Sequence, residues 1–400
     1  MQEQKEVTQL AAFKPFEMRG IPLEDQIMSW NQMIQHPYDK SSIDCYTRTR
    51  VILMNGIENN SVIVSHCMDR MIDNDDIKRQ LALIRRIDSQ HQQTVNWLNP
   101  ANQSVLETTI GYEQVAVDLT ANLAKNEKDD YFRRVLNFAL LEDFDHLFRY
   151  GCLLELLHGI DPNTITQGKT EIKPGRPTMV EHRHPFDEMR KHWSKDSVSV
   201  KTHMNYHTIV SAEQQTMLFY KSHGMQYTDD LARKLYAEIA EVEQQHVSQY
   251  EQVGDPNISP LERMALIQLN EAYNYFSCAE TEVDPRMKSI WQQFAEHEIQ
   301  HFHAVNELMK QHEGRDIRDI MDVETIEPLI VFESNKDYVN QILEEQASWQ
   351  AHNMEFVPED QLPSDWPSFA YRNKVNADGV PSEIVVETAR REARIPAVSI

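Results

Sequence analysis

The chain has 400 residues, more than a single hydrophobic core usually supports, so two domains with extensions are expected. Its formal net charge of −24 repels nucleic acid phosphate and anionic lipid, which argues against both as partners. The start, MQEQKEV, lacks a signal peptide, no apolar run is long enough to cross a bilayer, and the four cysteines form no CxxC pair. We therefore expect a cytoplasmic protein with reduced thiols and no membrane partner.

Helix-like apolar spacing and polar breakers divide the chain into five segments. In the second helical region the helices are predicted near 203–224, 228–251, 260–282 and 285–311. Loops IDNDD, LNPANQS and NEKDD divide the first helical region in the same way. The C-terminal segment is predicted to hold one helix, near 335–349, and an irregular tail. The five segments are an N-terminal extension (1–40), a first four-helix region (41–160), a connector (161–198), a second four-helix region (199–312) and a C-terminal extension (313–400).

The two helical regions match each other without gaps at an offset of 155 residues. NQSVLE at 102–107 falls on NISPLE at 257–262, and PLEDQIMSW before the first region resembles PFDEMRKHW before the second. Acidic and histidine positions agree better than the rest. The matched pairs include Glu58 with Glu213, Asp88 with Glu243, His91 with His246, Asp143 with Glu298, and His146 with His301. The sequence therefore predicts an internal duplication.

The second region carries the stronger metal-binding pattern. Residues at i and i+3 share a helix face, so the Glu-x-x-His pairs present a carboxylate and an imidazole to one point. Lone glutamates on the first and third helices follow at similar intervals, which brings all ligands to one level. Buried carboxylates would each cost several kcal/mol unless cations compensate them. The predicted dinuclear site consists of Glu213, Glu243, His246, Glu271, Glu298 and His301.

The order Glu, Glu-x-x-His, Glu, Glu-x-x-His resembles the ferritin-like di-iron carboxylate superfamily. The resemblance implies an all-α fold of two tandem ferritin-like four-helix bundles with N- and C-terminal extensions. It also implies that Glu243 and Glu298 or their partners bridge two metal ions, with one histidine on each ion. The family's long crossover between its second and third helices is missing, because about nine residues would have to cover about 25 Å. A stretched crossover and an up-down-up-down bundle both remain open.

The first region departs further from this pattern. Its pairs begin with aspartate, which reaches one methylene less, and Ala116 stands where the second region has Glu271. Glu113, one turn earlier on the same face, is the expected substitute. The resulting site is expected to be tighter, differently loaded, or vestigial and kept for packing. Its residues are Glu58, Asp88, His91, Glu113, Asp143 and His146.

Other conspicuous residues have simpler explanations. The pairs Glu155 with His158 and Glu181 with His184 are expected chance matches, and His297 and His303 should face away from the site. The tyrosines near the predicted centres are expected to be core aromatics, although redox roles stay open. They are Tyr112, Tyr220, Tyr250, Tyr273 and Tyr275.

Carboxylate-rich sites with one histidine per ion suit iron, with manganese as the alternative. The superfamily resemblance implies a non-haem di-iron oxidase or oxygenase that uses O2 on a small organic substrate, with electrons from a redox partner. A second hypothesis is peroxide scavenging or ferroxidase activity, as in rubrerythrin-like and ferritin-like proteins. A third is a metal-stabilised, non-catalytic scaffold whose extensions mediate assembly, for example into a homo-oligomer.

Overall fold

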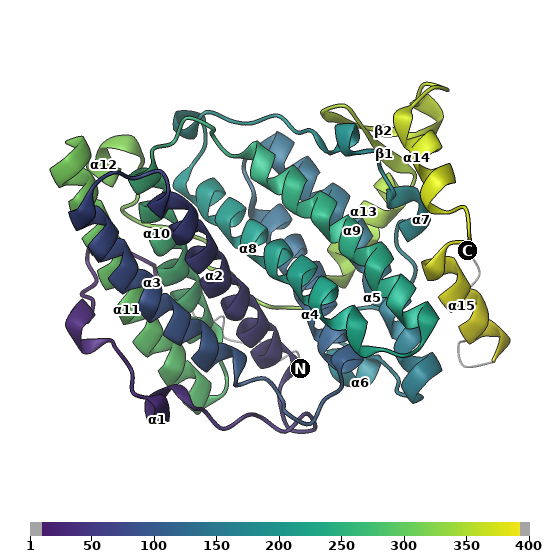
Figure 1. Cartoon of the computed structure of the whole chain (residues 1–400), viewed down its shortest axis with the longest axis horizontal. Coiled ribbons are helices and arrows are strands. Elements are labelled where there is room, and N and C mark those ends of the chain that lie inside the picture. Colours follow the sequence, from purple (N-terminus) through teal and green to yellow (C-terminus); the bar gives the residue numbers. More distant parts are fainter. Residues whose placement is uncertain (1–9, 393–400) are drawn as a thin grey trace, which may run out of the picture.

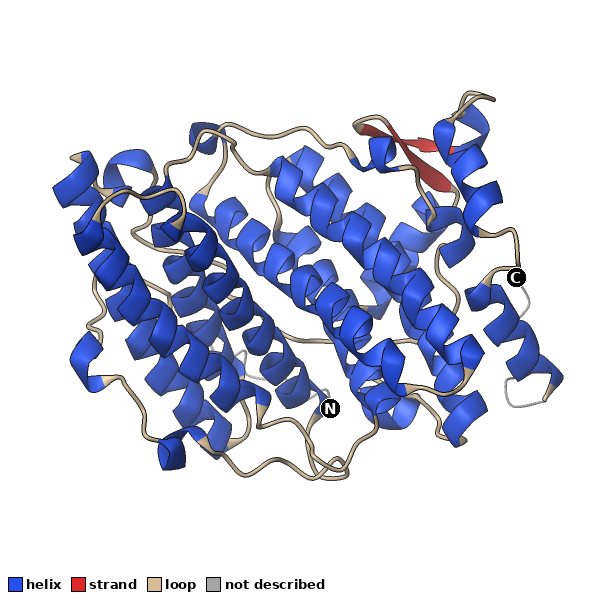
Figure 2. Cartoon of the chain, viewed as in Figure 1, coloured by secondary structure: helices blue, strands red, loops and turns tan. Residues whose placement is uncertain are grey.

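A computed structural model of the protein describes residues 10–392, so the segment MQEQKEV lies outside the described residues. The predicted all-helical class is confirmed: within this range the strands form one hairpin, β1 (Trp349–His352) with β2 (Glu355–Pro358) (Figure 2). The long helices are α2 (Cys45–Asp69), α3 (Asp75–Asn96), α4 (Val105–Asn126), α5 (Asp130–His158), α8 (Val200–His223), α9 (Asp230–Val253), α10 (Pro260–Thr281) and α11 (Pro285–Glu313). The last four begin and end within one turn of the predicted boundaries.

Each long helix begins after a Ser, Asp or Asn whose side chain accepts hydrogen bonds from backbone N–H groups of the first turn, which no helical carbonyl satisfies. These caps are Asp44, Asn74, Ser104, Asp129, Ser199, Asp229, Ser259 and Asp284. The last four follow the first four at the 155-residue offset. At the other end, α5 and α11 both stop at a glycine with φ of 65°, Gly159 and Gly314. The duplication therefore extends to the signals that start and stop the helices.

The long helices pack as two groups of four that lie side by side, and each group combines one helix pair from each repeat (Figure 1). Bundle 1 contains α2, α3, α10 and α11. Bundle 2 contains α4, α5, α8 and α9. Helix α2 also packs against α8 and α4, which joins the bundles. This packing differs from the predicted division into one bundle over 41–160 and another over 199–312.

The short loops between the helix pairs explain the exchange. Six residues, 254–259, connect α9 to α10, and they can span at most about 20 Å, whereas α9 is about 36 Å long. The chain therefore cannot return along α9 to start a parallel helix in the same bundle. Helix α10 instead joins bundle 1. Neither the stretched crossover nor the up-down-up-down bundle is present, because each bundle takes its two helix pairs from different repeats.

Gly56 lies where α2 meets α8, and a Cβ there would collide with the side chain of Gln215. That side chain donates to the carbonyl of Ile52 (2.7 Å) and accepts from Asn55 (2.9 Å). Gly56→Ala is expected to lower the free energy of unfolding by about 1–3 kcal/mol, because the amide must leave these partners. Urea unfolding measures this. A gain of about 1 kcal/mol, as helix propensity alone would give, would contradict it. Gly151→Ala on α5, whose Cβ would lie 3.2 Å from Pro162, provides a comparison with a milder clash and should cost less.

The extensions pack against the bundles. The N-terminal segment runs along α11, where the backbone N–H of Ile21 donates to the carbonyl of Glu296 (3.2 Å). The C-terminal segment is more ordered than predicted. Besides α13 (Lys336–Gln346), near the expected helix, it forms the β-hairpin, α14 (Pro367–Val375) and α15 (Pro381–Arg391). Helix α15 buries Val385, Val386 and Ala389 and packs against α5 and α9, so it extends the core of bundle 2.

The remaining described α-helices are single turns: α1 (Trp30–Met33), α6 (Asn163–Thr166), α7 (Thr178–Glu181) and α12 (Ile317–Ile320). Short 3-10 helices span Leu23–Asp25, Pro185–Glu188, Lys195–Ser197, Gly224–Gln226 and Glu359–Gln361. The four cysteines are free thiols, and all but Cys67 are buried. Over the described range, no helix is both long and apolar enough to span a bilayer.

Candidate metal centres

The twelve predicted ligands gather in two buried clusters, one inside each bundle. Every one of these residues is at most 1% exposed. Site 1, in bundle 1, contains Glu58, Asp88, His91, Glu271, Glu298 and His301. Site 2, in bundle 2, contains Glu113, Asp143, His146, Glu213, Glu243 and His246.

This grouping differs from the expected one, in which the second repeat alone formed the complete site. Each site takes one lone glutamate and one acid-x-x-His pair from each repeat. As a result, both have the same side chains: three glutamates, one aspartate and two histidines. The expected contrast between a complete and an altered site is replaced by two clusters of equal composition.

In site 1, the Glu298 carboxylate lies between the two imidazoles. Its Oε1 is 2.8 Å from Nδ1 of His91, and its Oε2 is 2.8 Å from Nδ1 of His301. Glu58 approaches the first imidazole (3.3 Å) and Asp88 the second (3.1 Å). Four ligand atoms, from Glu58, Asp88, His91 and Glu298, lie within 4.8 Å of one another. Glu298 is thus placed to bridge two ions.

Glu271 completes site 1 from α10. The hydroxyl of Ser61 donates across the cluster to Asp88 (3.0 Å) and to Glu271 (3.1 Å), and the Gln268 amide also donates to Glu271. On the other side, the hydroxyl of Tyr275 donates to Glu58 (2.6 Å). These neutral donors orient the carboxylates without neutralising them.

Site 2 repeats the arrangement with Glu243 at its centre. Its Oε1 is 3.0 Å from Nδ1 of His146, and its Oε2 is 3.4 Å from Nδ1 of His246. Ligand atoms of Asp143, Glu213, Glu243 and His246 lie within 4.8 Å of one another, and a second such group joins Glu243 to His146 and Glu113. Glu243 therefore belongs to two potential ion positions.

Glu113 enters site 2 from α4, as its place one turn before Ala116 predicts, and accepts a hydrogen bond from Tyr220 (2.5 Å). The tyrosines predicted as core aromatics thus include two that contact ligands, Tyr275 in site 1 and Tyr220 in site 2.

Several ligand oxygens make no hydrogen bond, although buried polar atoms normally have partners. In site 1 they belong to Glu58, Asp88 and Glu271. In site 2 both oxygens of Asp143 and of Glu213 make no hydrogen bond, nor does one oxygen each of Glu113 and Glu243. Nδ1 of His246 lies 3.3 Å from Asp143 and 3.5 Å from Glu213. Orphaned carboxylate oxygens that converge on one point fit a cation.

Without a cation, the carboxylates and imidazoles of site 1 compensate one another. Burial disfavours a charged imidazole, but Glu58 and Glu298 outweigh it and raise the pKa of His91 to about 9. Against the same burial, Glu298 and Asp88 raise the pKa of His301 to about 10. Burial would raise the pKa of Glu298, yet the two imidazoles hold it at about 2. Burial and the charge of Glu298 raise the pKa of Glu58 to about 8.

These pKa shifts predict that metal uptake by site 1 releases protons at neutral pH. His91, His301 and Glu58 all hold protons there, and each must lose its proton to become a ligand. Affinity should therefore rise with pH until about pH 10, the pKa of His301. An indicator dye in weakly buffered solution would record the release as Zn²⁺ is added. Uptake without acidification would contradict the assignment.

All four ligand histidines present Nδ1 to the carboxylates and Nε2 to an outer partner. In site 1, Nε2 of His301 is 2.7 Å from Oε1 of Gln26, and Nε2 of His91 is 2.9 Å from Nδ1 of His297. Such partners fix the ring orientation and tautomer of a metal-binding histidine. Gln26 comes from the N-terminal extension, so this segment completes the environment of site 1.

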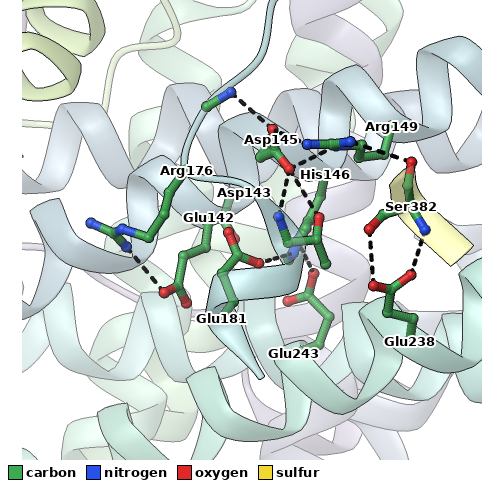
Figure 3. Close-up of polar contacts among 12 residues, drawn as sticks. Glu142, Asp143, Asp145, His146, Arg149, Arg176, Glu181, Glu238, Glu243 and Ser382 are labelled. Carbon is green, nitrogen blue, oxygen red and sulfur yellow. Dashed lines mark hydrogen bonds and ion pairs between the residues drawn. The ribbon is translucent and has the colours of Figure 1, made fainter. Parts of the chain in front are cut away.

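In site 2 the outer partners are carboxyl groups. Figure 3 shows His146 between Glu243 and Glu181, whose Oε2 is 2.9 Å from Nε2 of the ring. Nε2 of His246 is 2.8 Å from Glu142, which also accepts hydrogen bonds from Arg176 and Arg183. Burial disfavours a charged Glu142, but Arg183 and His246 hold its pKa well below the usual value.

The sequence did not predict the outer partners of the ligand histidines. The sequence predicts that Glu181 and His184 match the acid-x-x-His pattern by chance. In the structure Glu181 lies on α7 and contacts His146. His297, expected to face away, contacts His91. His303 does face away, toward the carbonyl of Met18 (3.3 Å). Glu142 lies directly before a ligand, and Gln26 lies within the segment that resembles the one before the second repeat. Neither position forms a metal-ligand spacing, so tertiary contacts alone identify them.

Each cluster thus offers four carboxylates and two imidazoles, enough donors for a pair of metal ions, in a pocket closed to bulk water. Comparison of the chain with protein-family models, with curated proteins and with solved structures found no match.

Proposed function

We propose that this protein is a non-haem di-iron oxidoreductase with two dinuclear centres, one in each bundle. The convergence of orphaned carboxylate oxygens inside both clusters carries the proposal. Four buried carboxylates are costly without cations, whereas two divalent ions balance them. Oxygen-rich sites with one imidazole per ion suit iron, with manganese as the alternative.

In this proposal, the ions of site 1 would be held by Glu58, Asp88, His91, Glu271, Glu298 and His301, and those of site 2 by Glu113, Asp143, His146, Glu213, Glu243 and His246. Bound iron would supply electrons to O2 or peroxide. The protein holds the ligands at fixed positions, excludes bulk water, and keeps a proton beside one ligand oxygen of each site through a tyrosine hydroxyl. These hydroxyls belong to Tyr275 and Tyr220.

A cavity of about 400 Å³ supports an organic substrate, as in an oxidase or oxygenase. It lies between the end of α8 and the start of α9, and Tyr220 and Tyr236 are among its lining residues. The Tyr220 hydroxyl donates to Glu113, so one residue contacts both the cavity and a ligand of site 2.

The burial of the ligands favours a second candidate, peroxide scavenging or ferroxidase activity. Each ligand is at most 1% exposed, so small reactants such as peroxide, O2 and ferrous ions reach the centres more readily than bulky ones. This activity needs no substrate cavity.

Anaerobic loading with ferrous iron, followed by air, tests the proposal. Growth of the absorption of oxo-bridged diferric iron together with O2 uptake is expected. Turnover with peroxide alone would select the second candidate, whereas O2 uptake that requires an added organic substrate would select the first. Bound metal that reacts with neither oxidant would leave a non-catalytic scaffold and contradict the oxidoreductase assignment.

A further inference from the structure

The two sites have the same set of ligand side chains, but the outer partners of their histidines differ. The differing partners lie at matching positions of the repeat. Glu142, the partner of His246, and His297, the partner of His91, occupy equivalent positions of the repeat at the 155-residue offset. Glu181 serves His146 from the connector, and Gln26 serves His301 from the N-terminal extension. Site 2 therefore has carboxylates where site 1 has neutral groups.

We propose that these outer partners differentiate the two centres. Site 2 binds metal more tightly than site 1, and the metal bound there has a lower reduction potential. A carboxylate that accepts the Nε2–H bond draws the proton toward itself and makes the imidazole a stronger donor at Nδ1. A stronger donor stabilises higher charge on the metal ion. The ligands cannot cause this difference, because their composition is the same in both sites.

Glu181 is expected to have the larger effect of the two carboxylates. Glu142 shares its charge with Arg176 (3.0 Å) and Arg183, which weakens its pull on His246. No arginine of the described chain hydrogen-bonds to Glu181, whose second oxygen is buried and has no hydrogen-bond partner. Its Oε2 therefore faces the imidazole of His146 without an arginine that competes for it (Figure 3).

Gln26 is the matched neutral group in site 1. Its Oε1 is 2.7 Å from His301, while its Nε2 donates to the carbonyl of Ile21 (2.6 Å). The second bond fixes which amide atom faces the histidine. Gln26→Glu and Glu181→Gln thus exchange a carboxyl group and an amide between the sites with almost no change in side-chain volume.

The inference rests on the proposed metal function, and Co²⁺, which needs no redox reaction, tests both. Full-length Glu298→Ala leaves site 2, and full-length Glu243→Ala leaves site 1. Competition with a chelator is expected to show that the site 2 protein binds Co²⁺ roughly 10- to 100-fold more tightly. Glu181→Gln should remove most of this advantage, and Gln26→Glu should tighten site 1. Redox titration of the iron-loaded proteins should place the potential of site 2 below that of site 1.

Gln26→Glu and Glu181→Gln can also be introduced into the otherwise wild-type chain, where every ligand is kept and Co²⁺ binding to both sites is measured. Each swap should bring the two phases of Co²⁺ binding closer together. Equal affinities in the two single-site proteins, or swaps that leave binding unchanged in a folded chain, would overturn the differentiation alone. Loss of Co²⁺ binding from both single-site proteins would overturn the metal function, and this inference with it.

Discussion

Replacement of Glu298 or of Glu243 by alanine should each remove about half of the bound metal, and the double variant should retain almost none. Glu298 contacts both imidazoles of site 1, and Glu243 contacts both imidazoles of site 2. Loss of a central carboxylate leaves each ion short of a ligand and leaves two histidines without their shared partner. Elemental analysis after metal loading and desalting measures the result.

The combination of the two variants tests the exchange of helix pairs between the repeats. If both residues served one site, either single change would remove the same ions and the double variant would lose no more. Glu296→Ala and Glu241→Ala are matched controls, because these exposed glutamates lie two residues before the ligands on the same helices. Neither control should lower the metal content.

Arg183→Ala should lower the free energy of unfolding by about 3–5 kcal/mol. Both terminal nitrogens of this buried guanidinium contact Glu142, one of them at 2.9 Å. Its removal leaves Glu142 with Arg176 and His246 only, in a place that water does not reach. A buried charge that loses one of its partners keeps its cost of desolvation, with less attraction to offset it. Urea unfolding measures the loss.

Arg79→Ala on α3 provides the comparison. This arginine pairs with Asp76 at 2.8 Å, but its side chain is 72% exposed, so water replaces the partner at little cost. A change of less than about 0.5 kcal/mol is expected. Equal effects of the two arginine changes would contradict the structural role assigned to the pair of Arg183 and Glu142.

Local sequence signals predicted the helices and the acidic and histidine residues that cluster inside the bundles, because both depend on short-range spacing. Cap residues and apolar periodicity mark where each helix starts and stops. The i, i+3 pairs place an acid and a histidine on one face in any helix. Glu113 could be chosen over Ala116 because one helical turn keeps a side chain on the same face, and it lies in the cluster with His146 and Glu243.

The grouping of the helices could not be read in the same way. The repeats are alike, so a helix pair from one repeat matches the face of either copy. Only the length of the loops distinguishes the arrangements. The loop before Pro260 is short for a crossover within one bundle. In the structure α10 packs in bundle 1 instead. The sequence predicts that the two repeats differ in their ligands. Because each site draws on both repeats, each site instead contains one aspartate and three glutamates.

The outer partners depend on tertiary contacts that spacing does not encode. Gln26 and Glu181 lie outside the long helices and reach their histidines because the extension and the connector fold back over the bundles. Their contacts with ligand histidines give both segments a direct part in the proposed metal chemistry.

The most direct test of two dinuclear centres is the amount of iron that one chain binds. After anaerobic loading with ferrous iron and removal of the excess, the wild-type protein is expected to hold about four ions per chain and to develop oxo-bridged diferric absorption in air. A chain that saturates at about two ions would contradict the claim of two dinuclear centres. A chain that retains no iron or manganese would contradict the metal assignment altogether.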